Sequence, residues 1–236
     1  MYINPQYLLY MLPAFLLMAL TSWYVKSAYN RWLKVRARSG MTGYQAAQRL
    51  IASAGLYGIQ IDGIRGNLTD AYDPRSKTLH LSRAVAEGAS VASLAIAAHE
   101  LGHAMQDADD YLPLRFRSAL VPMVNLGSNL GWILIMVGLF LSYAGLTFGV
   151  DLAWLGVAAF GGGAVFALAT LPVELNASMR ARKLLADTGL IQGEDEQRGV
   201  NAVLNAAALT YVAALVTAVL QLLYYANLVG GARRRN

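Results

Sequence analysis

The chain has 236 residues, of which 56% are hydrophobic and 14% charged, whereas an ordinary soluble domain carries roughly 25% charged residues. This composition excludes a disordered, fibrous or purely water-soluble protein. Cysteine is absent, so His, Asp or Glu side chains must hold any metal ion. Twelve of the 19 Lys and Arg residues lie between Lys26 and Arg117. This uneven distribution is informative about membrane topology and predicts no nucleic-acid partner.

Four apolar stretches are long enough to cross a bilayer, because a helix rises about 1.5 Å per residue and needs roughly 20 apolar residues to span the hydrocarbon core. They comprise residues 7–25, 120–143, 152–173 and 203–229. The first stretch lacks the basic residues that precede the apolar part of a signal peptide, so we interpret it as an uncleaved anchor.

Basic clusters predict the orientation of these stretches. Five basic residues directly follow the first one, which places that end in the cytoplasm and Met1 outside. The segment 144–151 has no Lys or Arg and suits the outer face, so the second and third stretches form a hairpin. A fourth crossing would place the arginines at 233–235 outside, against the positive-inside rule. The sequence therefore leaves open whether the last stretch crosses fully.

These patterns predict a mainly α integral membrane protein with about four transmembrane helices and a small cytoplasmic α+β region. The expected segments are an N-terminal transmembrane anchor (1–28), a cytoplasmic α+β region (29–118), a transmembrane hairpin (119–173), a cytoplasmic helical segment (174–202), and a C-terminal transmembrane helix with a basic tail (203–236).

The cytoplasmic region shows local signals for helices and strands. Thr42 is a plausible N-cap for a short amphipathic helix that ends near Gly55. Strands are expected around residues 59–64 and 78–81, separated by a turn. Ser90 is a good N-cap for a helix that runs to about Asp107.

That last helix carries two of the three histidines, in the sequence His99-Glu100-Leu101-Gly102-His103. Residues four apart lie on one face of a helix, so His99 and His103 can bind one metal ion from the same side. Glu100 is offset by about 100° and is better placed to take a proton from a metal-bound water than to be a ligand. Gly102 lacks a side chain, so another backbone or a substrate strand can come close to this helix.

A hydrolytic zinc ion needs a third protein ligand and one open position. Glu174 is the preferred candidate, because the predicted hairpin returns it to the side of the membrane that holds the two histidines. Ala177 and Ser178, one turn later, leave room for the first helix to pack. Glu174 could instead be a carboxylate near a helix N-terminus. The alternative ligands are Asp107, Asp109, Asp110 and His80.

The chain closely resembles the bacterial membrane-bound neutral zinc metallopeptidases of the YugP type, and more distantly the HtpX-like peptidases of the gluzincin group. The resemblance covers most of the chain. It includes the stretches 41–43, 68–75, 98–106, 171–178 and 204–211. It implies a zincin-like fold around the HExxH helix, one Zn²⁺ per chain held by His99, His103 and Glu174, and Glu100 as the general base.

Two positions depart from the family pattern. Many gluzincins have an Asp four residues after the ligand Glu, where this chain has Ser178. The YugP-type pattern usually has a His where this chain has Ala71. The resemblance therefore predicts no carboxylate partner for a ligand histidine at Ser178. It predicts no catalytic role for Ala71.

The leading hypothesis is thus a zinc endopeptidase of the bacterial inner membrane, with its active site facing the cytoplasm and membrane-bound or membrane-adjacent polypeptides as substrates. Tyr211 and Asn205 are candidates for the second oxyanion donor, or for hydrogen bonds between helices. One alternative function is a non-catalytic scaffold or chaperone that retains a metal site. Another is cleavage inside the bilayer, but the apolar run before the HExxH motif, residues 91–98, is short and acidic residues follow the motif. The sequence makes no prediction of the oligomeric state.

Overall fold

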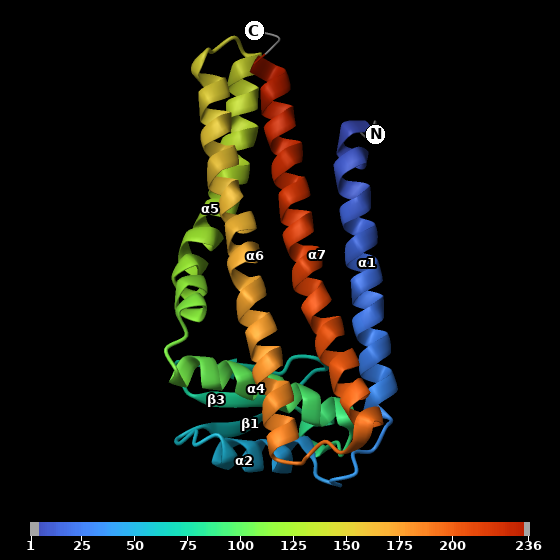
Figure 1. Cartoon of the computed structure of the whole chain (residues 1–236). Helices are drawn as coiled ribbons and strands as arrows, with labels where there is room; N and C mark the ends of the chain where they lie inside the picture. The colour runs from blue at the N-terminus through green and yellow to red at the C-terminus, as the bar shows by residue number, and fades with distance from the viewer. Residues whose placement is uncertain (1–4, 234–236) are drawn as a thin grey trace. The chain divides into compact units, whose positions relative to one another are not determined.

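A computed structural model describes residues 5–233. The predictions for Met1 and for the last two of the three terminal arginines lie outside these residues. Along the chain (Figure 1) the elements are α1 (Pro5–Leu33), α2 (Gly43–Ser53), β1 (Gln60–Ile64), β2 (Ala71–Asp73), β3 (Thr78–Ser82), α3 (Arg83–Glu87), α4 (Val91–Ala108), α5 (Leu112–Tyr143), α6 (Phe148–Asp187) and α7 (Gly193–Arg233).

The prediction of a mainly helical chain with about four candidate membrane-spanning helices and a small sheet is confirmed. Among the described residues, α1, α5, α6 and α7 are long and apolar enough to cross a membrane. Each helix is longer than the apolar stretch that predicted it. For example, α6 continues to Asp187 because the polar part still carries apolar residues at helical spacing, and Ala177, Ala181 and Leu185 there are buried.

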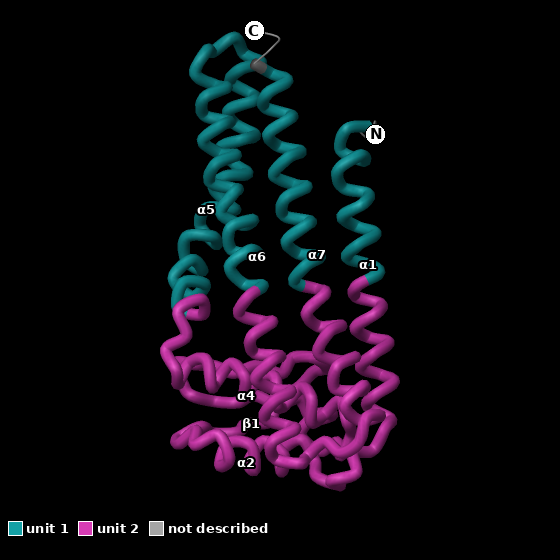
Figure 2. The backbone as a smooth tube through the Cα atoms, viewed as in Figure 1, with its two compact units in different colours: residues 1–20, 115–171, 211–236 teal, residues 21–114, 172–210 magenta. Residues whose placement is uncertain are grey.

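The chain divides into two compact units, which Figure 2 shows in different colours. Unit 1 comprises Met1–Leu20, Arg115–Leu171 and Tyr211–Asn236, and unit 2 comprises Thr21–Leu114 and Pro172–Thr210. The divisions fall within the four long helices, so each of these helices contributes residues to both units.

In unit 1, glycines let α5 and α6 pack backbone against backbone. A Cβ atom at Gly131 would lie 2.8 Å from the carbonyl oxygen of Gly156, and one at Gly138 would lie 2.4 Å from the backbone nitrogen of Ala153. Fully buried Ile135 packs into the cluster at this contact. In a bilayer the hydrophobic effect does not drive helices together. Close backbone packing of this kind stabilises their association instead.

In unit 2, a three-stranded sheet has the order β1-β3-β2. The central strand β3 pairs parallel with β1 and antiparallel with β2. Leu79 and Leu81 of β3 are fully buried in the core of the unit. The predicted strands at 59–64 and 78–81 are confirmed. The sequence patterns did not reveal β2 and α3, because both are too short to show a period.

The two predicted N-caps of unit 2 are also confirmed. The Thr42 side chain accepts a hydrogen bond from the backbone N–H of Gln45, and the Gln45 side chain accepts one in return from the Thr42 N–H. This capping box fixes the start of α2. Ser90 accepts a hydrogen bond from the Ser93 N–H and starts α4. In Figure 1, α2 and α4 lie beside the sheet.

Candidate metal centre

The helices α4 and α6 meet inside unit 2 at a pair of small residues. A Cβ atom at Gly102 of α4 would lie 2.4 Å from the carbonyl oxygen of Ala177 in α6, a distance that real side chains do not reach. Ala177 itself is fully buried. The expectation that Gly102 admits another backbone is therefore confirmed, and the close approach brings Glu174 of α6 to the histidines of α4.

Three predicted ligands converge at this contact. The Nε2 atom of His99 lies 3.3 Å from Oε2 of Glu174, and the Nε2 atom of His103 lies 3.4 Å from the same oxygen. The two imidazole rings are nearly perpendicular, with centroids 4.9 Å apart. The Glu174 side chain is 3% exposed, so its carboxylate is almost completely removed from water. Together the three residues form a group that could hold a metal ion.

The geometry and chemistry of this donor set fit zinc. Ligand atoms about 2.0 to 2.1 Å from a tetrahedral zinc ion lie roughly 3.3 Å from one another, which matches the two nitrogen-to-oxygen distances of 3.3 and 3.4 Å. Two imidazoles and one carboxylate are a ligand set of catalytic zinc sites, in which the fourth position stays open for water.

The outer nitrogen of each imidazole has its own partner. His99 Nδ1 lies 3.2 Å from the Ser178 hydroxyl oxygen, and His103 Nδ1 lies 3.0 Å from Oε1 of Gln106. Since an amide oxygen can only accept, His103 carries its proton on Nδ1 and presents the Nε2 lone pair to a metal. Ser178, where many gluzincins have Asp, thus still contacts a candidate ligand histidine, but without a negative charge.

Gln106 connects the two helices beneath the site. It is fully buried, and its Nε2 donates to the carbonyl oxygen of Val173 at 2.8 Å and to Oδ1 of Asn176 at 3.0 Å. Arg180 donates from Nε to the same Asn176 oxygen. Sequence analysis gave Gln106 no role. The signal that could have identified it is its position three residues after His103, within reach of that ring.

Glu100 lies next to the ligand group and is held by the edge strand β2. Its Oε2 atom accepts a hydrogen bond of 3.1 Å from the backbone N–H of Tyr72. The Tyr72 hydroxyl donates to Oδ2 of Asp107, one helical turn beyond His103, at 2.9 Å. Two hydrogen bonds therefore hold β2 against α4, one within the motif and one a helical turn beyond it. Sequence reasoning missed this contact because β2 itself was not expected.

Burial shifts the protonation of these groups. Removal from water raises the pKa of the Glu100 carboxyl, and the neighbouring Glu174 adds to the shift while the two histidines oppose it. For His103, burial lowers the pKa, but the carboxylates of Glu174 and Glu100 outweigh it, so the net pKa is raised. Burial also raises the pKa of the Tyr72 hydroxyl, as does its hydrogen bond to Asp107.

The alternative ligands have other partners. Asp107 accepts the Tyr72 hydrogen bond, and Asp109 forms an ion pair with Arg180. His80, on β3, has Nδ1 3.9 Å from an oxygen of Asp62. Asn205 accepts a hydrogen bond from Arg182, which is the alternative role that the sequence suggested for it. Within residues 5–233, the group that could hold a metal ion contains His99, His103 and Glu174 and none of these residues.

Comparison with known proteins agrees with this chemistry. A family described as "Putative neutral zinc metallopeptidase" matches residues 7–230. The chain is 39% identical over 212 residues to a Bacillus subtilis protein named "Putative membrane protease YugP". The matched residues make up 90% of this chain and 91% of that protein. No solved structure matches. A match over nearly the whole length shows that this chain belongs to the neutral zinc metallopeptidase family that the resemblance indicated.

Proposed function

We propose that this protein is a membrane-embedded zinc-dependent endopeptidase in which His99, His103 and Glu174 hold one catalytic zinc ion and Glu100 is the general base. The observation that carries the proposal is the convergence of both Nε2 atoms on the Glu174 carboxylate, with Glu100 beside this group and not part of it. Family membership and the similarity to a protein named as a membrane protease support it.

Zinc bound here would act as a Lewis acid on water and on the peptide carbonyl. The residues of the chain supply the rest of the reaction. The Glu100 carboxylate takes the proton of the attacking water and returns it to the leaving amine nitrogen. The Tyr72 N–H holds one Glu100 oxygen and leaves the other for the transferred proton.

A non-catalytic scaffold with a structural metal is less well supported. Structural zinc sites are closed by four protein ligands, whereas the group found in the described part of the chain has three. Glu100 lies beside this group and is not one of its three residues, so a structural metal site would give this carboxylate no role.

The proposed substrates are membrane-bound or membrane-adjacent polypeptides, cleaved at the cytoplasmic face of the bacterial inner membrane. The motif helix α4 is not among the four helices that are apolar enough to span a bilayer, which supports action at the surface. We further propose the segment order given by the sequence, with residues 29–118 and 174–202 on the cytoplasmic side. The basic residues of these segments support it.

The test is a Glu100→Gln variant assayed on fluorescent casein in detergent. Since the amide is similar in shape but cannot accept the proton, we expect zinc and fold to be kept and turnover to fall by roughly 10² to 10⁴. The control is Glu87→Gln, which changes an exposed carboxylate paired with Arg83 and should retain full activity. Wild-type turnover in Glu100→Gln at equal zinc occupancy would leave the scaffold as the better hypothesis.

A further inference from the structure

Outside the candidate metal centre, α6 and α7 are joined within unit 2 by a cluster of polar side chains. Arg182 of α6 donates from Nε to Oδ1 of Asn201 at 2.8 Å and from Nη2 to Oδ1 of Asn205 at 2.6 Å. Both asparagines belong to α7. Because a guanidinium can only donate, each amide uses its oxygen for Arg182 and keeps its NH₂ group for another partner. The unused polar groups of the cluster, the two NH₂ groups and Nη1 of Arg182, are therefore all donors.

The cluster carries a positive charge without an ion-pair partner. Both partners of Arg182 are neutral amides, and within residues 5–233 it forms no ion pair. Partial burial lowers the pKa of the guanidinium, which has lost some of its water without gaining an opposite charge. Arg198 lies on the same face of α7, three residues before Asn201 and seven before Asn205. Glu194 is the nearest carboxylate on that face, about 10 Å along the helix from Asn201.

Exposed apolar side chains continue from the cluster along both helices. On α6, Leu175 and Met179 precede Arg182 by seven and three residues and lie on the same side of the helix. On α7, Leu209 follows Asn205 by one turn. These three side chains are 49%, 57% and 43% exposed, respectively. Since α6 and α7 are consecutive antiparallel helices with a short connection, all three extend from the cluster in the same direction.

We propose that Arg182, Asn201 and Asn205 bind the phosphate group of an anionic phospholipid, whose acyl chains lie against the exposed apolar side chains of α6 and α7. A guanidinium donates two parallel hydrogen bonds to phosphate, and the amide NH₂ groups can bind its other oxygens. The fourth apolar stretch (203–229) begins between the two asparagines, so the cluster lies where a candidate membrane-spanning helix changes from polar to apolar. Basic sites at this level of a membrane helix bind lipid headgroups.

The net charge of the lipid follows from the same donors. The ammonium group of a zwitterionic lipid would meet donors and cations in the cluster and no acceptor, whereas an anionic lipid brings no positive charge. A free phosphate ion offers the same oxygens but makes no contact with the apolar side chains.

The test measures which lipids the detergent-purified, delipidated full chain retains, by native mass spectrometry with dioleoyl phosphatidylglycerol and dioleoyl phosphatidylcholine at equal concentration. The wild-type protein should retain phosphatidylglycerol preferentially. In Arg182→Gln this preference should fall roughly tenfold, since a charge-assisted contact is lost. Lys183→Gln is the matched control, because it removes the same charge at an exposed position about 100° further round α6. Equal preferences in the two variants would overturn the proposal.

A second substitution separates lipid binding from the contact between α6 and α7. Asn205→Asp still accepts the hydrogen bond from Arg182, so the two helices stay joined and the Tm should not fall. The new carboxylate neutralises the guanidinium and repels phosphate, so the preference for phosphatidylglycerol should be lost. Gln48→Glu makes the same charge change at an exposed amide of α2 and should keep the preference. Wild-type preference in Asn205→Asp would show that the cluster only joins the helices.

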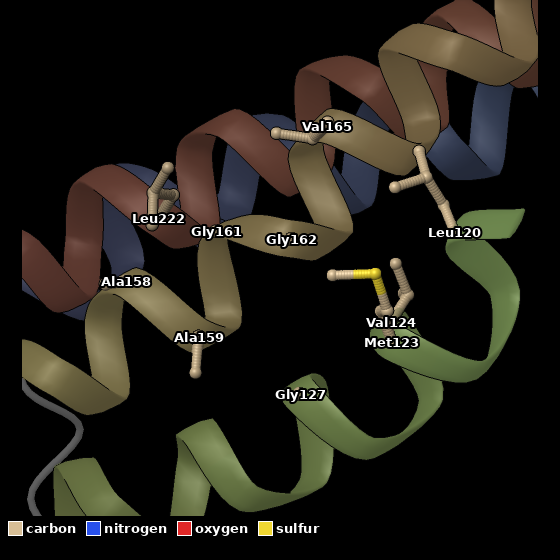
Figure 3. Close-up of a pocket in the computed structure, with 10 residues that line it drawn as sticks. All are labelled: Leu120, Met123, Val124, Gly127, Ala158, Ala159, Gly161, Gly162, Val165 and Leu222. Atoms are coloured by element: carbon tan, nitrogen blue, oxygen red, sulfur yellow. The ribbon is translucent and has the colours of Figure 1, made fainter. Parts of the chain in front are cut away.

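A last comparison identifies the source of the phosphate. Inorganic phosphate, at the concentration used for the lipid, should neither displace phosphatidylglycerol nor raise the Tm of the delipidated chain. A rise in Tm that Arg182→Gln abolishes would assign the cluster to free phosphate and overturn the lipid assignment. Acyl chains can also enter an apolar groove between α5 and α6 in unit 1, whose lining has no polar side chain (Figure 3). Binding there does not distinguish headgroups and does not contribute to the preference.

Discussion

At the scale of single residues, the candidate site is defined by which nitrogen of each histidine faces inward. Gln106 decides this for His103, because its amide N–H₂ group is already used by Val173 and Asn176 and leaves only its oxygen for the ring. The same buried amide joins α4 to α6. Gln106 thus orients His103, a proposed ligand, and holds the helix that carries Glu174.

The ligand set predicts a clear pattern of zinc loss. His99→Ala, His103→Ala and Glu174→Ala should each lose the metal, because two remaining ligands make a weak site. Asp107→Ala and Asp109→Ala should keep it, since these carboxylates bind Tyr72 and Arg180 instead. Elemental analysis of the purified variants measures this. Full zinc content in Glu174→Ala with loss in an aspartate variant would reject the assignment.

Replacing the orienting amide should weaken zinc without removing a ligand. In Gln106→Leu the His103 Nδ1–H loses its acceptor, and we expect zinc affinity to fall by roughly 10- to 100-fold. The measurement is competition for zinc with a chromophoric chelator. Gln48→Leu, which alters an exposed amide on α2, is the control. Equal affinities in both variants, with Gln106→Leu folded by circular dichroism, would show that the contact does not tune the metal.

At the scale of elements, the site depends on how closely two helices approach. α4 presents His99 and His103 on one face, and Gly102 between them lets the backbone of α6 reach this face. The ligands would not converge if either helix carried a larger residue at the crossing. The edge strand β2 completes the arrangement by binding Glu100 and Asp107 through Tyr72.

A methyl group added where α4 and α6 cross should therefore lower both the stability of the protein and its zinc content. Gly102→Ala forces α4 and α6 apart, and overpacking of this kind costs about 1 to 3 kcal/mol. We expect a lower Tm and lower zinc content. Gly162→Ala on α6 meets open space and should leave the Tm equal or slightly higher, because Ala favours helix over Gly. If thermal unfolding of the two variants were the same, the crossing would not be tightly packed.

At the scale of the whole molecule, the distribution of charge is the feature that relates the chain to the membrane. Basic residues lie between the first and second apolar stretches and again between the third and fourth. The loop between the second and third stretches has no Lys or Arg. This alternation supports a cytoplasmic site, because Lys and Arg are retained on that side of the bilayer.

The topology predicts which positions react with a membrane-impermeant maleimide. Single cysteines can be placed without background, since the chain has none. Tyr57→Cys, at a residue that is 91% exposed, and Asp187→Cys should label only in inverted vesicles, whereas Thr147→Cys should label in intact cells. Labelling of Tyr57→Cys and Asp187→Cys from opposite sides would contradict the proposed topology.

The sequence by itself determined the features that depend on neighbours along the chain. Apolar length identified the four candidate membrane-spanning helices, and capping side chains located the starts of α2 and α4. The spacing of His99 and His103 placed both on one helix face. Each of these signals is contained in a few helical turns, because helical period and capping are local properties. The family was readable for the same reason, since its motifs are short and contiguous.

Only the tertiary structure decided which faces meet. The sequence preferred Glu174 by counting ligands and by topology, but the contact of Gly102 with Ala177 is what brings that carboxylate within 3.4 Å of both imidazoles. The role of Gln106 and the hydrogen bond from Tyr72 to Glu100 also came from the fold. These contacts join residues 28 or more positions apart, and their geometry follows from packing between helices and strands, which no local pattern encodes.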